Sequence, residues 1–185
     1  MMKLPTVIVL ASGRGERFRA SGGAVHKLDA LIAGRSVRER TLDAVRASGL
    51  PWHMEDAGHP GMGDSISAAV RATADANGWL ILPADLPLTA AATLRRVAET
   101  LAEGKWQAVQ PAYRAMKGHP VGFAASCGDA LKSLGGEHGA APVLRTLRGE
   151  GKVCDFEIDD VGIVTDIDTL ADLAAAEALW ISSLR

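Results

Sequence analysis

Two short runs of consecutive apolar residues stand out in the hydrophobic and polar pattern of the chain. Thr6 to Leu10 and Trp79 to Leu82 are continuous, rich in β-branched and aliphatic side chains, and shorter than a typical helix. Such runs are typical of strands that are buried on both faces of a sheet. We expect a long loop from Ala11 to His26 after the first strand, and Pro83 ends the second.

Helices with recognisable start and stop signals lie between the predicted strands. Ser36 and Glu39 form a capping-box pattern, and Gly49 ends the helix of about a dozen residues that they open. The other helices are predicted at 65–75 after Asp64 or Ser65, at 90–103 after Thr89, near 127–134 and 140–148, and after Asp168 or Thr169. Further strands are expected at 52–54, 107–110, 121–124 and 153–158, the last of which alternates like an edge strand.

Strand and helix segments alternate along the chain. This order predicts an α/β fold in which a mostly parallel sheet is covered by helices. The sequence has no internal repeat and no low-complexity linker. We therefore expect one domain over residues 1–185.

The charge of the chain is nearly balanced but unevenly distributed. A formal net charge of −2 argues against a general nucleic-acid or membrane-surface binder. Residues 1–40 carry eight basic and three acidic side chains, whereas the remainder carries twelve basic and nineteen acidic ones. A basic N-terminal segment on an acidic body fits an anionic ligand that binds locally, although the distribution is also compatible with chance.

The cysteines and the apolar runs indicate in which cellular compartment the protein is expected. Cys127 and Cys154 show neither a C-x-x-C pattern nor the spacing of metal ligands, so we expect two reduced thiols. The apolar run at 7–11 is far too short for a membrane span or a signal sequence, and charged residues follow it closely. These features predict a cytoplasmic protein.

The loop after the first strand combines glycines with arginines. Gly13 and Gly15 alternate with Arg14, and Arg17 follows, at the carboxyl end of the strand, where open α/β sheets bind ligands. Glycine lets backbone N–H groups approach a phosphate closely, and arginine adds positive charge. We therefore favour a phosphate-binding loop over an ordinary strand-to-helix turn.

Two common nucleotide-binding loops are excluded. A dinucleotide fingerprint that begins at Gly13 requires glycine where Phe18 stands. A Walker loop requires Gly-Lys-Ser or Gly-Lys-Thr, but Lys27 is preceded by His26 and followed by Leu28. An oxidoreductase of the dinucleotide-binding type is therefore disfavoured.

Asp85 follows the second buried strand and is flanked by Pro83 and Pro87. A carboxylate at this position is well placed to hold Mg²⁺ on a phosphate. The structural alternative is an aspartate that caps a turn, and the strand context favours the metal.

Five segments, taken in order, resemble the MobA-like NTP transferases, the nucleotidyltransferases of the molybdenum cofactor. Three of the family patterns are L-A-A-G-x-S-x-R followed by K-L, a strand-ending D-x-P, and G-H-P-V. The matching segments are Leu10 to Arg17 with Lys27-Leu28, Gly61 to Ile66, Leu82 to Pro87, Gly118 to Val121, and Asp166 to Thr169. The segment Gly61 to Ile66 is similar to the G-M-G-x-S-L element of the cytidylyltransferase branch.

The resemblance implies a three-layer Rossmann-like fold and an Mg²⁺-dependent reaction. In that reaction the nucleotidyl group of an NTP, with CTP favoured, is joined to the phosphate of molybdopterin and pyrophosphate is released. Such an in-line transfer needs positioning and charge neutralisation rather than a protein nucleophile. The partners implied are the NTP, a molybdopterin-type acceptor, and a recipient molybdoenzyme or its chaperone.

The resemblance also assigns roles to individual residues. The catalytic candidates are Lys27 and Arg17 on the triphosphate and Asp85 on the metal. The nucleotide-binding candidates are Leu10, Ala11, Ser12, Gly13, Arg14, Gly15, Gly61, Met62, Gly63 and Ser65. The acceptor-binding candidates are His119, Gly136 and Gly139. Asp166 is a second candidate metal ligand, although a turn carboxylate is the favoured explanation, and His26 is a candidate phosphate contact.

The chain departs from the family pattern in three places. The segment 18–26 is about five residues longer than is usual, and the segment 50–60 is shorter. Ser12 stands where alanine or glycine is usual. These differences put the substrate in doubt more than the fold. Two other functions therefore remain open, transfer to another phosphorylated acceptor such as a sugar phosphate or small acid, and nucleotide binding without catalysis.

Overall fold

Strand β1 (Thr6–Leu10) lies between β4 (Trp52–Glu55) and β5 (Trp79–Pro83) and is parallel to both. The computed structural model describes residues 3–184. The sheet continues from β5 through β8 (Val121–Phe123) to β6 (Ala108–Tyr113), with β8 antiparallel to both neighbours. The outer partners of β6 are β7 (Met116–Lys117), which is antiparallel, and β9 (Val153–Glu157), which is parallel.

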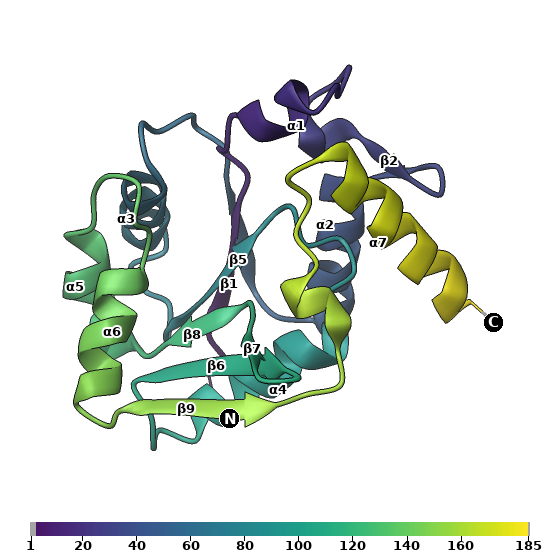
Figure 1. Cartoon of the computed structure of the whole chain (residues 1–185). Helices are drawn as coiled ribbons and strands as arrows, with labels where there is room; N and C mark the ends of the chain where they lie inside the picture. The colour runs from purple at the N-terminus through teal and green to yellow at the C-terminus, as the bar shows by residue number, and fades with distance from the viewer. Residues whose placement is uncertain (1–2, 185) are drawn as a thin grey trace.

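Helices cover the two faces of this sheet (Figure 1). Their bounds are α1 Glu16–Ala20, α2 Val37–Ser48, α3 Met62–Ala72, α4 Ala91–Ala102, α5 Gly128–Lys132, α6 Ala141–Gly149 and α7 Leu170–Ser183. Short 3₁₀ turns lie at Lys27–Asp29, Ala125–Cys127 and Val161–Val164, and β2 (Leu31–Ile32) pairs with β3 (Arg35–Ser36) in a small separate hairpin. In Figure 1, α3, α5 and α6 lie on one side of β1 and β5, and α2, α4 and α7 lie on the other. The predicted mostly parallel α/β architecture is confirmed.

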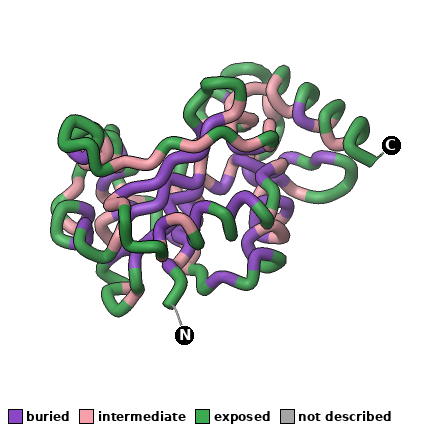
Figure 2. Tube along the Cα trace, turned by 90° about the horizontal axis from the view of Figure 1, so that it is seen from below, coloured by how far each residue is buried: buried purple, intermediate pink, exposed green. Residues whose placement is uncertain are grey.

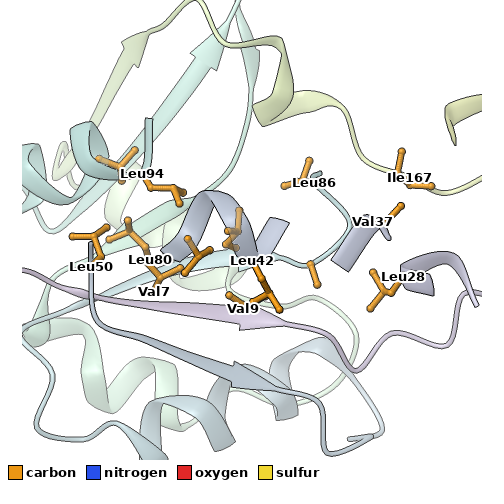
Figure 3. Close-up of a cluster of buried hydrophobic side chains, with 14 of the residues drawn as sticks. Val7, Val9, Leu28, Val37, Leu42, Leu50, Leu80, Leu86, Leu94 and Ile167 are labelled. Atoms are coloured by element: carbon orange, nitrogen blue, oxygen red, sulfur yellow. The ribbon is translucent and has the colours of Figure 1, made fainter. Parts of the chain in front are cut away.

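The alternation of side chains along β1 builds a core on each face of the sheet. Val7 and Val9 join one apolar cluster, whereas Ile8 and Leu10 join another. The first cluster also contains Leu42 of α2 and Leu94 of α4, as Figure 3 shows. In Figure 2 the buried residues follow the central strands, while the outer turns of the helices are exposed. The continuous apolar runs therefore mark strands buried on both faces.

The observed helix caps agree in part with those predicted from the sequence. Ser36 caps α2 by accepting a hydrogen bond from the Glu39 N–H (3.2 Å), and Gly49 ends the helix in the left-handed region. The Glu39 carboxylate accepts from Arg46 (3.0 Å). Thr169 caps α7, and its side chain and that of Asp172 bond each other's backbone in a complete capping box.

Several predicted boundaries are wrong. The segment 11–26 contains α1 and is not loop throughout. Helix α3 is capped by Gly61 and begins at Met62, so neither Asp64 nor Ser65 starts it, and it ends at Ala72. Helix α4 begins after Ala90 rather than Thr89, because the Ala90 N–H is satisfied by the distant Asp160 carboxylate (3.0 Å). No helix within residues 3–184 is long and apolar enough to cross a bilayer.

Candidate functional site

A cavity of about 900 Å³ opens at the carboxyl ends of β1 and β5. This is the edge of the sheet at which the sequence predicts the ligand. The cavity is lined by most of the candidate residues: Leu10, Ser12, Gly13, Arg14, Gly15, Arg17, Lys27, Gly61, Met62, Ser65, Asp85, His119 and Asp166. The candidates that do not line it are Ala11, His26, Gly63, Gly136 and Gly139.

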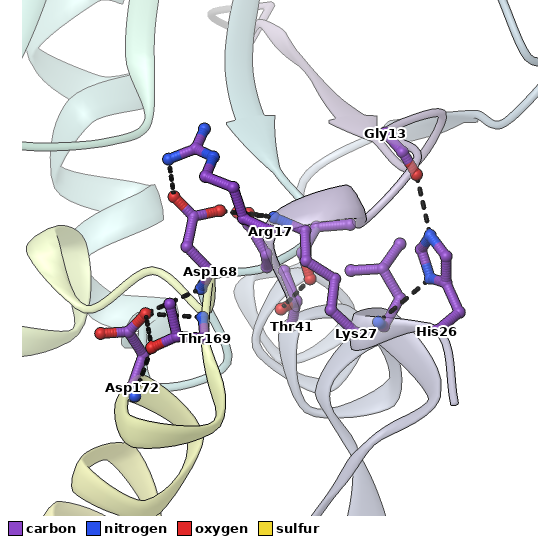
Figure 4. Close-up of polar contacts among 11 residues, drawn as sticks. Gly13, Arg17, His26, Lys27, Thr41, Asp168, Thr169 and Asp172 are labelled. Carbon is purple, nitrogen blue, oxygen red and sulfur yellow. Dashed lines mark hydrogen bonds and ion pairs between the residues drawn. The ribbon is translucent and has the colours of Figure 1, made fainter. Parts of the chain in front are cut away.

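Lys27 is the polar centre of this cavity. Its ammonium donates a hydrogen bond to Asp85 Oδ2 at 2.6 Å and another to Asp168 Oδ1 at 3.0 Å. The other oxygen of Asp168 accepts from Arg17 at 2.5 Å (Figure 4). The side chains of Lys27 and Asp85 are only 13% and 16% exposed, whereas that of Arg17 is 80% exposed. Two cations and two carboxylates from distant segments therefore meet at one wall.

Backbone hydrogen bonds fix Asp85 at the end of β5. The N–H of Ala84 donates to the Leu10 carbonyl of β1 (2.9 Å), and the Ala84 carbonyl accepts from the Thr41 hydroxyl of α2 (2.8 Å). The Asp85 carbonyl accepts from the Ile167 N–H (3.0 Å). Because Ile167 is fully buried, the same bond places Asp168 beside Lys27.

The charges around Lys27 decide its protonation. Burial by itself lowers the pKa of Lys27, but the charges and hydrogen bonds of Asp85 and Asp168 outweigh it, and the pKa is raised. The ammonium form is therefore fixed at neutral pH. For Asp166, burial and, to a smaller extent, the neighbouring carboxylates raise the pKa. Asp166 forms no salt bridge within residues 3–184, so it is open to a further cation.

The loop after β1 is held in shape by Gly15 and His26. Gly15 has a φ of +65° and precedes α1, a conformation that L side chains adopt rarely. His26 Nδ1 accepts from the Leu28 N–H (3.2 Å), and its Nε2 lies 2.8 Å from the Gly13 carbonyl. A neutral ring with its proton on Nε2 satisfies both contacts. His26 thus positions the loop, and both its nitrogens are already occupied.

Two glycine-rich turns are interlocked on the opposite wall. The Gly63 N–H donates to the Gly136 carbonyl (2.7 Å), and the Gly136 N–H donates to Asp64 Oδ2 (3.0 Å). A Cβ on Gly61 would overlap the backbone of Gly136, and Gly139 lies directly against the Met62 sulfur. Gly136 and Gly139, predicted to bind the acceptor, therefore support the turn formed by residues 61–63.

This interlock makes Gly61→Ala a test of the turn. We expect the added methyl to push the two backbones apart, with a loss of about 1–3 kcal/mol in the free energy of unfolding. The matched control is Gly149→Ala, because a Cβ there meets no atom within 4 Å. Urea denaturation of both variants measures the difference. Equal stability of the two variants would contradict the close packing at Gly61.

Ser12 and His119 occupy different walls of the cavity. The Ser12 hydroxyl lies 2.7 Å from that of Ser65, which also contacts the Gly61 carbonyl (3.2 Å). Ser12 therefore links the loop after β1 to α3. The backbone N–H of His119 donates to the Ile163 carbonyl (3.0 Å). Burial lowers the pKa of the His119 imidazole, which is consequently neutral at pH 7.

Some residues of the cavity could not be identified from the sequence. Asp168 was expected only as a cap or turn residue, yet it binds both Lys27 and Arg17. His59 and Lys117 also line the cavity. The signal for Asp168 was its spacing from Asp166 on either side of an apolar residue, which is typical of two carboxylates that border a buried position.

The arrangement suits a polyphosphate and a hard cation. Lys27 and Arg17 supply positive charge, while Asp85, Asp166 and Asp168 supply carboxylate oxygens. Within residues 3–184 no three His, Cys, Asp or Glu side chains already form a metal-binding cluster. Mg²⁺, however, commonly uses one or two carboxylates and completes its shell with water and substrate phosphates.

Solved structures of other proteins have the same fold. A nucleotidyl transferase from Methanothermobacter is 20% identical, with a TM-score of 0.77 over 97% of this chain and 99% of that chain. Rv0371C from Mycobacterium tuberculosis in complex with manganese is 21% identical, with a TM-score of 0.68 over 92% and 96%. The molybdopterin-guanine dinucleotide biosynthesis protein A of Archaeoglobus fulgidus is 17% identical, with a TM-score of 0.64 over 96% and 99%.

The family itself is identified from the sequence. Curated proteins give no match. The model of the MobA-like NTP transferase domain matches residues 43–152, more than half of the chain. The matched range contains the Gly61–Gly63 turn, Asp85 and His119. The chain thus belongs to the MobA-like NTP transferase domain family, and it is a nucleotidyltransferase with a Rossmann-like fold.

Proposed function

We propose that the chain transfers the nucleotidyl group of CTP to the phosphate of a molybdopterin-type acceptor and releases pyrophosphate. The observation that carries the proposal is the Lys27 ammonium, held between Asp85 and Asp168 beside Arg17 at the carboxyl edge of the sheet. The likeness of Gly61 to Ile66 to the cytidylyltransferase element supports CTP as the donor. A recipient molybdoenzyme or its chaperone is the partner that this acceptor would require.

The proposed reaction needs no covalent enzyme intermediate. An oxygen of the acceptor phosphate forms a bond to the α-phosphorus, and the bond from that phosphorus to the bridging oxygen of the β-phosphate breaks. The departing pyrophosphate carries away the negative charge of the bond electrons. Lys27 and Arg17 are placed to neutralise charge on the triphosphate oxygens, which is where such a transfer requires stabilisation.

A divalent cation, Mg²⁺ in our proposal, fits the same wall. Oδ2 of Asp85 and Oδ1 of Asp168 both lie within hydrogen-bond distance of one ammonium, so their oxygens converge on a single positive charge. Asp85 and Asp166 are the residues proposed to hold the ion, and Asp168, which shares the Lys27 ammonium with Asp85, is a third candidate. When bound, the cation would supply Lewis-acid polarisation of the phosphate oxygens. A solved structure of similar fold is a manganese complex, which supports the proposal of a divalent cation.

Thermal unfolding with nucleotides tests the donor site. We expect CTP with Mg²⁺ to raise the melting temperature by about 5–10 °C, because a ligand at about 100 times its Kd adds about 2.7 kcal/mol of stability. GTP, ATP and UTP serve as comparisons, and the chelator EDTA should abolish the metal-dependent part. The absence of a shift with every triphosphate would contradict the proposed donor site.

Pyrophosphate release then tests the acceptor. With CTP and Mg²⁺ present, molybdopterin should stimulate release, while sugar phosphates and phosphorylated small acids should not. Release with one of these instead would assign a different acceptor to the same reaction. Binding of nucleotide without release for any acceptor would support a non-catalytic nucleotide-binding protein.

A further inference from the structure

A buried carboxylate lies beneath the loop that joins β4 to α3. Glu55 ends β4, and its side chain is only 9% exposed. Its Oε1 accepts from the Ala57 N–H (3.1 Å) and lies 3.1 Å from Nε2 of His59. On the other side, Nε2 of His53 is 3.6 Å from Oε2, beyond hydrogen-bond distance. No lysine or arginine within residues 3–184 pairs with Glu55.

This contact fixes the tautomer of His59. An ionised carboxylate only accepts hydrogen bonds, so the proton of a neutral His59 ring must be on Nε2. The other nitrogen, Nδ1, is then an acceptor. Within residues 3–184, Nδ1 of His59 has no hydrogen-bond partner, and the His59 side chain is 28% exposed. His59 lines the cavity, whereas His53 does not.

The topology places His59 across β1 from the charged wall. In the sheet, β4 and β5 flank β1 on opposite sides, and Asp85 follows β5. His59 follows β4 and directly precedes Pro60, Gly61 and Met62, which also line the cavity. A triphosphate against Lys27 and Arg17 would leave the part of the cavity that His59, Pro60 and Gly61 border free for the nucleoside.

We infer that His59 reads the base of the bound nucleotide, and that Glu55 is the positioning residue that fixes its tautomer. Nδ1 accepts a hydrogen bond from an exocyclic amino group, such as the 4-amino group of cytosine. Uracil carries a carbonyl oxygen at that position, which would bring two acceptors together. The inference rests on the proposed function, and it gives the preference for CTP over UTP a physical cause.

The test measures Kd for CTP and UTP by calorimetry in the presence of Mg²⁺, without any acceptor. The two nucleotides have the same size and differ only at position 4 of the ring and in the proton that uracil carries on N3, so we expect the wild-type chain to prefer CTP by about 10- to 100-fold. His59→Ala should reduce the preference to about threefold or less. The control is His53→Ala, which removes the other histidine near Glu55 and should leave the preference unchanged.

Glu55→Gln tests the positioning role. Glutamine is the same size, but its amide both donates and accepts, so the tautomer of His59 is no longer fixed and the preference for CTP should fall. The ¹⁵N NMR spectrum of the nucleotide-free wild-type protein gives a second readout. It should show a pyridine-like Nδ1 for His59 and a protonated Nε2.

Three outcomes would overturn the inference. The first is equal affinity for CTP and UTP, or a preference for UTP, as expected if both ring nitrogens are protonated. The second is an unchanged preference in His59→Ala. The third is a spectrum in which Nδ1 carries the proton. Failure of the wild-type protein to bind any triphosphate would instead overturn the proposed function, and this inference with it.

Discussion

Replacing Asp85 with asparagine is expected to reduce nucleotidyl transfer by about 10³-fold while the chain remains folded. Asparagine keeps the size of the side chain, and the backbone carbonyl of residue 85 still accepts from Ile167. What is lost is a carboxylate that lies 2.6 Å from Lys27 and that we propose to bind the cation. The loss should therefore appear in the rate rather than in the fold.

The same substitution should change Lys27. Burial lowers the pKa of this lysine, and Asp85 is the main group that opposes it. With Asp85 neutral, only Asp168 supports the ammonium form, so the pKa of Lys27 should fall relative to the wild-type chain. A pH profile of residual activity that shifts toward lower pH in Asp85→Asn would reflect this change.

The control for Asp85→Asn is Asp43→Asn. Asp43 accepts two hydrogen bonds from Arg35 on the outer surface of α2, and it does not line the cavity. Its replacement removes a carboxylate and an ion pair without touching the proposed machinery. Pyrophosphate release and the melting temperature are measured for both variants. Full activity in Asp85→Asn would overturn the proposed role of Asp85.

Elements with a strong local signal were predictable from the sequence. Strands β1 and β5 are continuous apolar runs, and α2 has a serine cap and a terminal glycine. The missed elements, α1 and the strands β2, β3 and β7, have two to five residues each. Such segments are too short to show a period, and tertiary contacts decide their conformation.

The site was predictable where its residues lie in one motif and unpredictable where distant segments meet. Lys27 and Asp85 were identified, and the structure brings them together. Asp168, however, is 141 residues from Lys27, and its spacing from Asp166 does not reveal which distant cation it meets. The role that we infer for His59 depends on the buried Glu55, and burial of a carboxylate cannot be deduced from a four-residue strand.

Lys27→Met should lower stability in a manner that depends on pH. Methionine has a similar length but leaves Asp85 and Asp168 without the ammonium that they share, close to Asp166. Their mutual repulsion should raise the pKa of these carboxylates in the folded state, as burial together with neighbouring carboxylates already does for Asp166. At pH 7 we expect a loss of about 2 kcal/mol in the free energy of unfolding. This loss is smaller than that for a fully buried ion pair, because the side chains are partly exposed to water.

The sign of this pH dependence follows from linkage. A carboxyl group whose pKa is raised by folding stabilises the folded state while it is protonated, and it loses that effect as the pH rises from its unfolded value, about 3.9, through its folded value. In the wild-type chain the raised pKa of Lys27 lies far above this window, so the ammonium is charged throughout it. The difference between the two proteins should consequently be small near pH 4 and full at pH 7.

A divalent cation should partly replace the missing ammonium. In Lys27→Met the oxygens of Asp85 and Asp168 no longer compete with an internal cation, so Mg²⁺ or Mn²⁺ alone should raise the melting temperature of the variant more than that of the wild-type chain. The control is Lys105→Met, because within residues 3–184 Lys105 pairs only with Glu103, on the exposed surface. If Lys27→Met is as stable as the wild-type chain from pH 4 to 7, and its melting temperature does not respond to the metal, these carboxylates do not act as one group. A metal response confined to Lys27→Met would instead show that the lysine and the cation compete for the same oxygens, and that binding of the metal-nucleotide requires Lys27 to move from the carboxylates to the phosphates.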